Sequence, residues 1–213
     1  MDFGRAYTFM TADPRWISKI MIAAAVSSVP ILNFALYGYA LDVLKRVYEG
    51  SDLPMPEWDD FGKYFVRGLI VSAGMLIWQL PIMILIAPII IGGILADSAV
   101  VWILGLACLL PIAVIALAVI VQVVVARYAL APEFGEMFNI SAIFSEARRG
   151  AGTLLLCLLA YVVATVVGTI AGIVTCFIGF FFLTPWLTLA QAHLLGQAYR
   201  QIRGVPQVTT TSF

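Results

Sequence analysis

The positions of the basic residues constrain this chain more than any other feature of its sequence. All twelve Lys and Arg residues lie outside three long apolar tracts. No basic residue occurs between Arg67 and Arg127 or between Arg149 and Arg200, and the second interval also contains no Asp or Glu. A lipid bilayer is the solvent that excludes charge over such lengths. The sequence therefore predicts an all-α integral membrane protein whose basic residues gather where helices leave the membrane.

The composition agrees with this fold class and excludes others. Hydrophobic residues make up 62% of the chain and charged residues 11%, against roughly 25% charged residues in soluble domains. The formal net charge is zero, so we expect no nucleic-acid partner. The three cysteines (Cys108, Cys157 and Cys176) lie in apolar tracts without ligand spacing, so we expect no disulfide, metal or other cofactor. Residues 1–204 should form a single polytopic membrane domain without a cleaved signal peptide, followed by a disordered cytoplasmic tail at 205–213.

The first apolar tract, Ile20–Leu44, admits two arrangements. An amphipathic segment at residues 2–11, which we expect in the membrane interface, and Asp13-Pro14, typical of a helix start, precede it. The length of the tract fits one span of about 20 residues and excludes two ordinary spans. Because Pro30 and Asn33 interrupt its middle, a re-entrant or very short helical hairpin with its turn at residues 30–33 is the alternative.

The distribution of positive charge favours the re-entrant alternative. Cytoplasmic flanks of membrane proteins carry an excess of Lys and Arg. A single crossing would leave Arg5, Arg15 and Lys19 outside, whereas a re-entrant tract places every basic residue inside. Both alternatives place the C-terminus in the cytoplasm, and we expect a multi-pass protein of the cytoplasmic membrane.

The rest of the chain repeats one pattern, an interfacial elbow helix followed by a transmembrane helical hairpin. The elbows are expected at residues 57–67, ending near Gly68, and at 139–149. Four spans are expected after them: Leu69–Ile91 with Ala99–Val125, and Ala151–Thr175 with Phe177–Tyr199. Uncharged or nearly uncharged turns at 92–98 and 176–180 join each pair. With the N-terminal segment as a shortened copy, the chain contains two to three pseudo-repeats.

Short motifs between residues 13 and 69 resemble one protein family. They are Asp13-Pro14-x-Trp16, Val29-Pro30-Ile31, Gly38-Tyr39, Val47-Tyr48-Glu49-Gly50, Leu53-Pro54, Trp58-Asp59-Asp60-Phe61 and Gly68-Leu69. Together they resemble the domain-of-unknown-function family four-thousand-and-thirteen of bacterial and archaeal membrane proteins. More distantly, the layout is similar to the membrane domains of some glycerophosphodiester phosphodiesterases, whose catalytic domain has no counterpart here. The resemblance implies a polytopic membrane fold and transfers no site residues.

These motifs also have a physical interpretation. Gly38 would let a neighbouring helix approach closely. Tyr39 and Tyr48 could place their rings near the lipid headgroups. Asp42 lies on the same helical segment as Lys45 and Arg46, so a local ion pair is expected.

Six uncharged polar residues within apolar segments are the candidate site residues. They are Asn33, Gln79, Gln122, Gln191, His193 and Gln197. Each could join two helices by a hydrogen bond worth about 0.6–2 kcal/mol, which we favour, or line a polar pathway. His193 could relay protons, but a single histidine cannot form a closed zinc site.

Small residues recur at every fourth position in the third apolar tract, at Ala160, Ala164, Gly168 and Gly172. Such a stripe allows two helices to pack closely, and we favour a partner helix within the chain over one on another protein.

The leading function expected from the sequence is that of a non-enzymatic scaffold or accessory subunit of a membrane complex, with the bilayer, another membrane protein or a second copy as partners. The lack of charge within the membrane favours it, because pumps and ion-coupled carriers place ionisable residues there. The alternative is a transporter or channel for a small or lipophilic solute, which Pro-interrupted helices favour. A lipid-modifying enzyme comes third, because no activated nucleophile is evident.

Overall fold

The computed structural model describes residues 1–95, 99–175 and 178–205, with side chains for all of them except 89–90, 92–95, 99–106, 108–109 and 178. The expected turns around Asp97 and Cys176, and residues 206–213 of the expected tail, lie outside the described residues. The described part is helical throughout and contains no strand, which confirms the all-α prediction. Its elements are α1 (Phe3–Thr8), η1 (Phe9–Ala12), α2 (Trp16–Ser27), α3 (Asn33–Glu49), α4 (Phe61–Leu95), α5 (Ala99–Leu130), η2 (Phe134–Phe138), α6 (Ile140–Val174) and α7 (Ile178–Ile202).

Three helical segments are long and apolar enough to cross a membrane. They are Phe61–Pro88, Leu110–Leu130 and Ile140–Val174, and together with the composition they identify a membrane protein. Among the described residues α7, expected as the fourth span, is not one of them. Its C-terminal half carries Gln191, His193 and Gln197 and is buried among other helices, so it is more polar than a helix exposed to lipid.

The first apolar tract is broken into two helices, so a single straight span is wrong. The hydroxyl groups of Ser27 and Ser28 donate to the carbonyl oxygen of Ala24 as α2 ends, and Pro30 follows within the turn. The twelve residues of α2 extend about 18 Å, well short of the roughly 30 Å of a hydrocarbon core. The turn at residues 28–32 overlaps the turn expected at 30–33, although Asn33 already belongs to α3. Helix α2 begins at Trp16, later than the Asp13-Pro14 start expected from the sequence.

The second and third elbows are not separate helices. Helix α4 runs without a break through Gly68, and α6 runs through Gly150. Both glycines serve close packing. A Cβ atom at Gly68 would overlap the backbone carbonyl of Phe34 in α3, and one at Gly150 would overlap the Ile202 side chain. The glycines therefore mark helix contacts, which the sequence pattern could not distinguish from helix ends.

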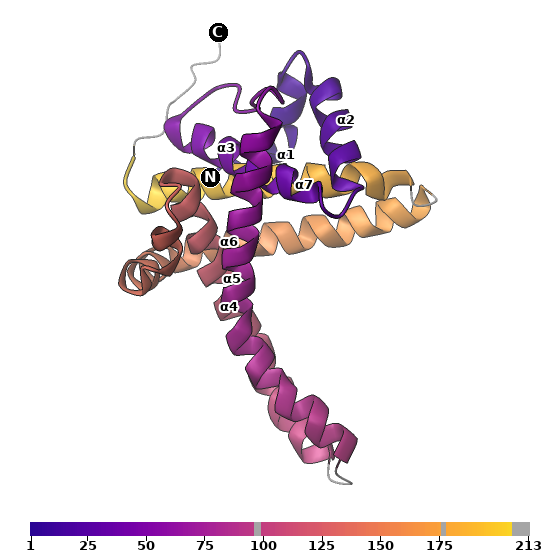
Figure 1. Ribbon diagram of the computed structural model, residues 1–213, viewed down its shortest axis with the longest axis vertical. Helices are drawn as coiled ribbons and strands as arrows, with labels where there is room; N and C mark the ends of the chain where they lie inside the picture. Colours follow the sequence, from indigo (N-terminus) through magenta and orange to yellow (C-terminus); the bar gives the residue numbers. More distant parts are fainter. Residues whose placement is uncertain (96–98, 176–177, 206–213) are drawn as a thin grey trace.

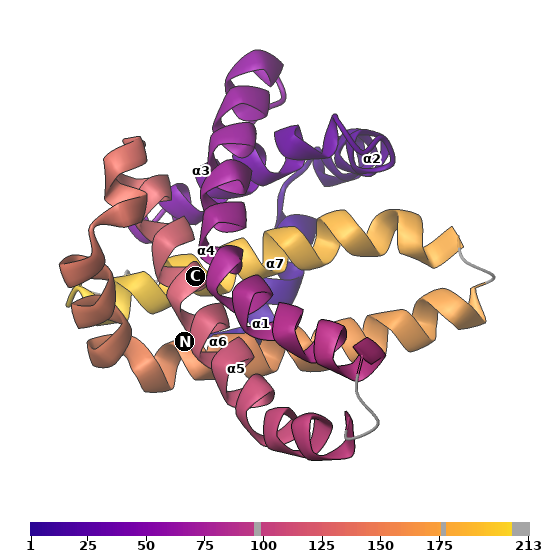
Figure 2. The same ribbon diagram turned by 60° about the horizontal axis from the view of Figure 1, so that its bottom comes forward.

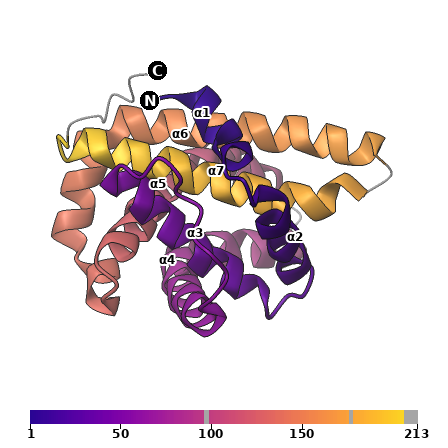
Figure 3. The same cartoon turned by 90° about the horizontal axis from the view of Figure 1, so that it is seen from above.

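The long helices form two arms that run crosswise (Figure 1). Helices α4 and α5 pair as one arm, and α6 and α7 pair as the other. Figure 2 and Figure 3 show the same relation from two further directions, with α6 and α7 extended across both views. Helices α4 and α5 point toward the reader in Figure 2 and away from the reader in Figure 3. Helix α3 packs against α4, α5 and α7 at the crossing, where Leu36, Tyr39 and Leu44 are buried in the core.

Ion pairs tie the helix ends together on one side of the crossing. Asp42 of α3 pairs with Arg67 and Lys63 of α4, the latter at 3.1 Å, so the expected pairing with Lys45 and Arg46 is wrong. Lys45 instead lies 3.9 Å from Glu49. The geometry favours Arg67 because it approaches from the packed face of α4, whereas Lys45 is half-exposed.

A second group of ion pairs centres on Glu146 of α6. Its carboxylate lies 3.1 Å from Arg127 of α5 and 3.0 Å from Arg203, which follows α7, and it accepts a hydrogen bond from Tyr199 at 3.0 Å. Arg127 also pairs with Glu136 of η2. We call these two groups together the polar layer. It joins the C-terminal ends of α5 and α7 to the N-terminal parts of α4 and α6.

Candidate binding cavity

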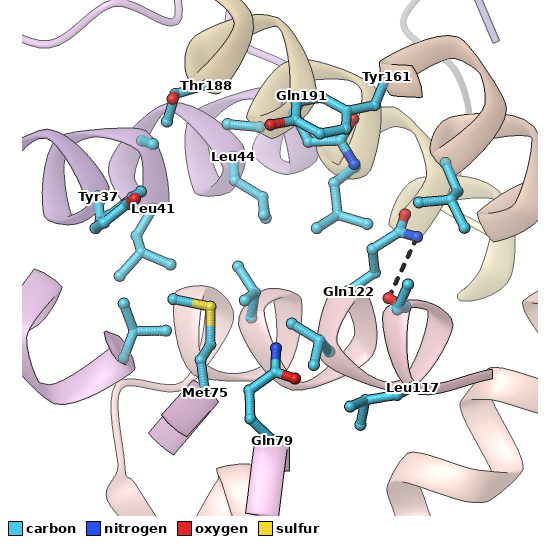
Figure 4. A pocket seen from close by; sticks show the side chains of 18 of the residues that line it. Tyr37, Leu41, Leu44, Met75, Gln79, Leu117, Gln122, Tyr161, Thr188 and Gln191 are labelled. Atoms are coloured by element: carbon cyan, nitrogen blue, oxygen red, sulfur yellow. Dashed lines mark hydrogen bonds between the residues drawn. The ribbon is translucent and has the colours of Figure 1, made fainter. Parts of the chain in front are cut away.

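A cavity of about 450 Å³ lies where the two arms meet α3. Its volume falls within the roughly 300–1,000 Å³ typical of small-molecule sites. Five helices, α3 to α7, supply its walls, and Figure 4 shows the side chains around it. Most of the lining is aliphatic, including Leu41 and Leu44 from α3, Met75 from α4 and Leu117 from α5. The cavity is therefore suited to an apolar body.

The polar groups of the cavity are uncharged. No Asp, Glu, Lys or Arg is among its described lining residues. The polar members of the lining are Tyr37, Gln79, Gln122, Tyr161, Thr188 and Gln191. Three of the candidate residues, Gln79, Gln122 and Gln191, thus come together from α4, α5 and α7 around one space (Figure 4).

Gln122 is the most deeply buried of these glutamines, with 7% of its surface exposed. Its Nε2 donates to the backbone carbonyl of Leu154 at 3.4 Å and to that of Ala118 at 3.5 Å. These two bonds orient the amide and leave Oε1 facing away from both carbonyls. Among the described residues Oε1 has no hydrogen-bond partner, and Oε1 of Gln191 shares this condition. Two residues that line the mostly aliphatic cavity thus each carry a buried acceptor without a partner among the described residues.

The cavity is open on the side formed by α4, α5 and α6. Three of its lining residues are exposed, namely Gln79, Val114 and Tyr161. The helix faces beside them carry exposed aliphatic side chains, with Leu76 and Leu80 on α4 and Ile115 on α5. In a bilayer these faces contact hydrocarbon, so the opening leads to the membrane interior rather than to water.

His193 and Gln197 lie on another side of α7 and hold α1 in place. The His193 ring stacks on Phe9 with 4.5 Å between centroids. The Gln197 amide accepts from the backbone N–H of Asp2 at 2.7 Å, donates to the Asp2 carbonyl at 3.1 Å and lies 3.1 Å from His193 Nδ1. These contacts give both residues a packing role, and neither lines the cavity.

Asn33 is also apart from the cavity. It is the first residue of α3, is half-buried, and its Oδ1 has no hydrogen-bond partner among the described residues. The six candidate residues therefore divide into a cavity group of three glutamines, an α1-docking pair and an isolated asparagine.

The small-residue stripe of α6 divides into two pairs that lie beside different helices. Gly168 and Gly172 are buried against α7, because a Cβ atom would overlap Leu183 at the first position and meet Phe180 at 2.9 Å at the second. Ala160 and Ala164 line an open apolar groove of about 490 Å³ between α1 and α6, where the Tyr7 hydroxyl donates to the Ala160 carbonyl at 3.0 Å. The stripe thus packs against two helices of its own chain.

Several contacts that organise the N-terminal half were not expected from the sequence. Tyr39 is fully buried, so its ring contacts protein rather than lipid, and its expected place near the level of the headgroups stays a prediction. Its ring stacks on Trp58 at 4.2 Å and its hydroxyl donates to the Pro56 carbonyl at 2.7 Å. Lys19, only 4% exposed, lies 2.6 Å from Asp13 and 2.7 Å from Glu57. The sequence places these residues far apart, so only the folded chain brings them together.

The cavity residues that the sequence analysis missed are Tyr37, Tyr161 and Thr188. One signal was available. Thr188 and Gln191 are three residues apart and so share a face of α7, which Gln197 does not share with them. Tyr37 and Tyr161 lie in apolar segments, as many other aromatic residues of the chain do. Nothing in their spacing distinguishes them as cavity residues.

Comparison with known proteins gives one match. A family model described as a protein of unknown function, DUF4013, matches residues 22–195, which is most of the chain. The chain belongs to the DUF4013 family. The match extends well beyond the motifs between residues 13 and 69 and takes in all five helices of the cavity. No curated protein and no solved structure matches this DUF4013 protein, and the more distant resemblance to glycerophosphodiester phosphodiesterase membrane domains is not shown.

Proposed function

We propose that this DUF4013 protein is a non-enzymatic carrier that binds a small lipophilic solute in the cavity between its two arms. The observation that carries this proposal is the uncharged, mostly aliphatic cavity at the junction of five helices. Because a lipophilic solute in the bilayer is already out of water, the cavity would bind it through close packing against its aliphatic walls. A charged solute would find no counter-charge among the described lining residues.

The side on which the cavity opens supports entry from the bilayer. Exposed aliphatic side chains flank the opening, so a solute dissolved in the membrane could enter without passing through water. Prolines lie within three of the helices that enclose the cavity, at Pro81 and Pro88 in α4, Pro111 in α5 and Pro185 in α7. Each removes a backbone hydrogen bond, which gives the helix a point at which to bend. Such bending would open and close the cavity.

The proposal also includes the orientation of the protein in the membrane, which the polar layer and the N-terminal helices define. Because the basic residues gather at this layer, we place it and the C-terminus on the cytoplasmic side of the cytoplasmic membrane. Helices α2 and α3 form a shallow hairpin that enters and leaves on that side. The first turns of α4 and α6 lie in the interface. The repeat of an interfacial segment followed by a hairpin stays a prediction.

Photolabelling of the full-length protein in lipid vesicles tests the carrier function. The probe is an alkane that carries a diazirine, and its adducts are assigned to residues by fragmentation mass spectrometry. We expect adducts at cavity residues such as Leu117 in addition to exposed residues such as Ile112. Ala118→Phe fills the cavity and should reduce the cavity adducts about tenfold, a change of about 1.4 kcal/mol. Ala116→Phe places the same ring on the exposed face of α5 and is the matched control. Adducts confined to exposed residues in the wild-type protein would refute the proposal.

A second candidate is the scaffold or accessory subunit expected from the sequence. The crosswise arms favour it, because each presents exposed aliphatic side chains along its length, such as Ile84 at 72% and Val167 at 62% exposure. Lipid or another membrane protein could cover these faces. The two candidates separate in the Ala118→Phe variant, since filling an internal cavity should leave the capture of a protein partner unchanged while it removes solute binding.

A further inference from the structure

The buried amide of Gln122 restricts the chemistry of the solute. Gln122 lines the cavity, and its Nε2 donates to the carbonyl oxygens of Leu154 and Ala118. Its buried Oε1 has no partner among the described residues. A buried acceptor that lacks a donor is costly, and the cost falls when a ligand supplies the donor. Gln191 offers a second acceptor from the facing helix α7, as Figure 4 shows.

We propose that the solute is a neutral amphiphile whose hydroxyl or amide N–H donates a hydrogen bond to Gln122 Oε1, while a hydrocarbon body fills the rest of the cavity. This inference rests on the proposed carrier function and names its substrate class. Gln122 is the residue that sets specificity, because it is the only one of the three cavity glutamines that is more than nine-tenths buried.

The cavity argues against the charged alternatives. A carboxylate or phosphate would bring its negative charge to an amide oxygen, while the amide nitrogen of Gln122 is already engaged. An ammonium group could donate to Oε1, but no carboxylate is among the described lining residues, and an unpaired charge in an apolar site is expensive. An uncharged donor satisfies the oxygen without either cost.

Two matched photoprobes test the inference on the full-length protein in lipid vesicles. One is dodecanol that carries a diazirine, and the other is its methyl ether, which has the same chain but no donor. Adducts at exposed α5 residues provide the internal reference for each probe. We expect the alcohol to label cavity residues about tenfold more than the ether, as a single hydrogen bond to a buried acceptor allows. This comparison needs no variant.

The Gln122→Met variant assigns the preference to the amide. Methionine keeps the length of the side chain and removes the acceptor, so the labelling of the cavity by the alcohol should fall to that of the ether. Ile115→Met, on the exposed face of the same helix, is the control and should leave both yields unchanged. If both probes label the cavity equally in the wild-type protein, the carrier function stands, and the inference that the solute donates a hydrogen bond to Gln122 is overturned. If neither labels the cavity above the exposed reference, the carrier function fails as well.

Discussion

At the scale of single residues, glycines decide how closely α3 and α4 pack. Gly38 of α3 lies against the backbone of Tyr64, and Gly68 of α4 lies against the backbone of Phe34. Each glycine lies against the backbone of the other helix, and the two glycines are also close to each other. The amide nitrogen of Gly38 is among the atoms nearest to a Cβ built at position 68. A flexible side chain can change its rotamer to make room, but backbone atoms cannot. These two positions therefore admit no residue larger than glycine.

The variant Gly68→Ala should therefore lower the free energy of unfolding by at least about 2 kcal/mol, because the added methyl group forces the helices apart. Gly152→Ala in α6 is the control, since a Cβ there meets no atom within 4 Å. Within a helix, that control should be neutral or should gain up to about 1 kcal/mol. Titration with SDS in mixed micelles, followed by circular dichroism, measures both. Equal stability of the two variants would mean that α3 and α4 are not in contact at Gly68.

Asp13 and Lys19 form the most deeply buried ion pair of the N-terminal half, with side chains 7% and 5% exposed. Burial alone would raise the pKa of Asp13. The hydrogen bond from Lys19, the backbone N–H of Arg15 and the nearby positive charges outweigh it, so the pKa of Asp13 lies below its ordinary value of 3.8. A lowered carboxyl pKa means that the charged form stabilises the fold.

The stability that Asp13 contributes should be fully present above pH 3.8 and should be lost as the pH falls through the lower pKa of the folded state. Asp13→Asn should cost about 3 kcal/mol at neutral pH, because Lys19 keeps only Glu57 as a counter-charge. The difference between the variant and the wild-type protein should shrink below the ordinary pKa. Asp59→Asn, on an exposed side chain, should change little. A cost for Asp13→Asn that is unchanged at low pH would contradict the assignment.

At this scale the sequence predicts residue types better than partners. The absence of basic residues over 68–126 and of all charged residues over 150–199 identifies the apolar membrane segments from the sequence alone. The partner of Asp42 could not be predicted, because Lys45, Arg46, Lys63 and Arg67 all lie within reach in sequence and only the crossing of α3 with α4 selects the last two. The same holds for the cavity: three glutamines within apolar segments could be named in advance, but whether they face one space depends on helix rotation.

At the scale of elements, α1 is held to the rest of the protein by few contacts. Gln197 makes two hydrogen bonds to the backbone of Asp2, and His193 stacks on Phe9 just after α1. The helix has only six residues and is too short to be stable alone. Its order therefore depends on these contacts with α7, together with the hydrogen bond from Tyr7 to α6 and the ion pair of Arg5 with Asp52.

Gln197→Leu should release α1. The loss of two hydrogen bonds of about 1 kcal/mol each predicts amide exchange at residues 3–8 that is faster by at least about tenfold, with little change in α4 and α5. Hydrogen–deuterium exchange with mass spectrometry measures it, and Gln191→Leu, which lies on the cavity side of α7, is the control. His193→Phe should keep α1 protected, since a phenyl ring can still stack on Phe9. If residues 3–8 lose their protection from exchange in His193→Phe but keep it in Gln197→Leu, the nitrogens of the imidazole ring would be what holds α1 in place.

The elements themselves show where hydropathy stops being informative. It locates the long helices and the break near Pro30, because apolar length and a missing backbone N–H act locally. Hydropathy does not locate the starts of α4 and α6. An amphipathic segment and the apolar segment after it form one continuous helix when no residue interrupts the backbone hydrogen bonding. Gly68 was expected near such an interruption, yet its role depends on Phe34 and Gly38 of α3, which lie far from it in the sequence.

At the scale of the whole molecule, the crosswise arms place the two hairpins in different orientations. If α4 and α5 lie along the membrane normal, α6 and α7 run close to the membrane plane (Figure 3). Helix α6 has 35 residues and extends about 52 Å, longer than the roughly 30 Å of the hydrocarbon core. The four side-by-side spans expected from the sequence would require a different arrangement.

Single cysteines in a cysteine-free variant distinguish the two arrangements. We expect cysteines at Asp2, Asp52 and Glu133, all exposed and beside the polar layer, to react with an impermeant maleimide from the cytoplasmic side. A cysteine at Asp97, between α4 and α5 in sequence, should react from the outside. Crosswise arms predict that a cysteine at Thr175, which ends α6, does not react from the outside. Reaction of both Asp97 and Thr175 positions from the outside would instead establish two hairpins that cross in parallel.

The crosswise arms also give the protein an unequal footprint in the two leaflets. With α4 and α5 along the membrane normal, one leaflet contains little more than this helical pair, while α6, α7 and the N-terminal helices broaden the molecule in the leaflet nearer the polar layer (Figure 1). The protein then displaces more lipid from that leaflet than from the other. A molecule of this wedge shape fits best where the leaflet nearer the polar layer is convex. Vesicle diameter should therefore influence where this protein accumulates, independently of any solute it carries.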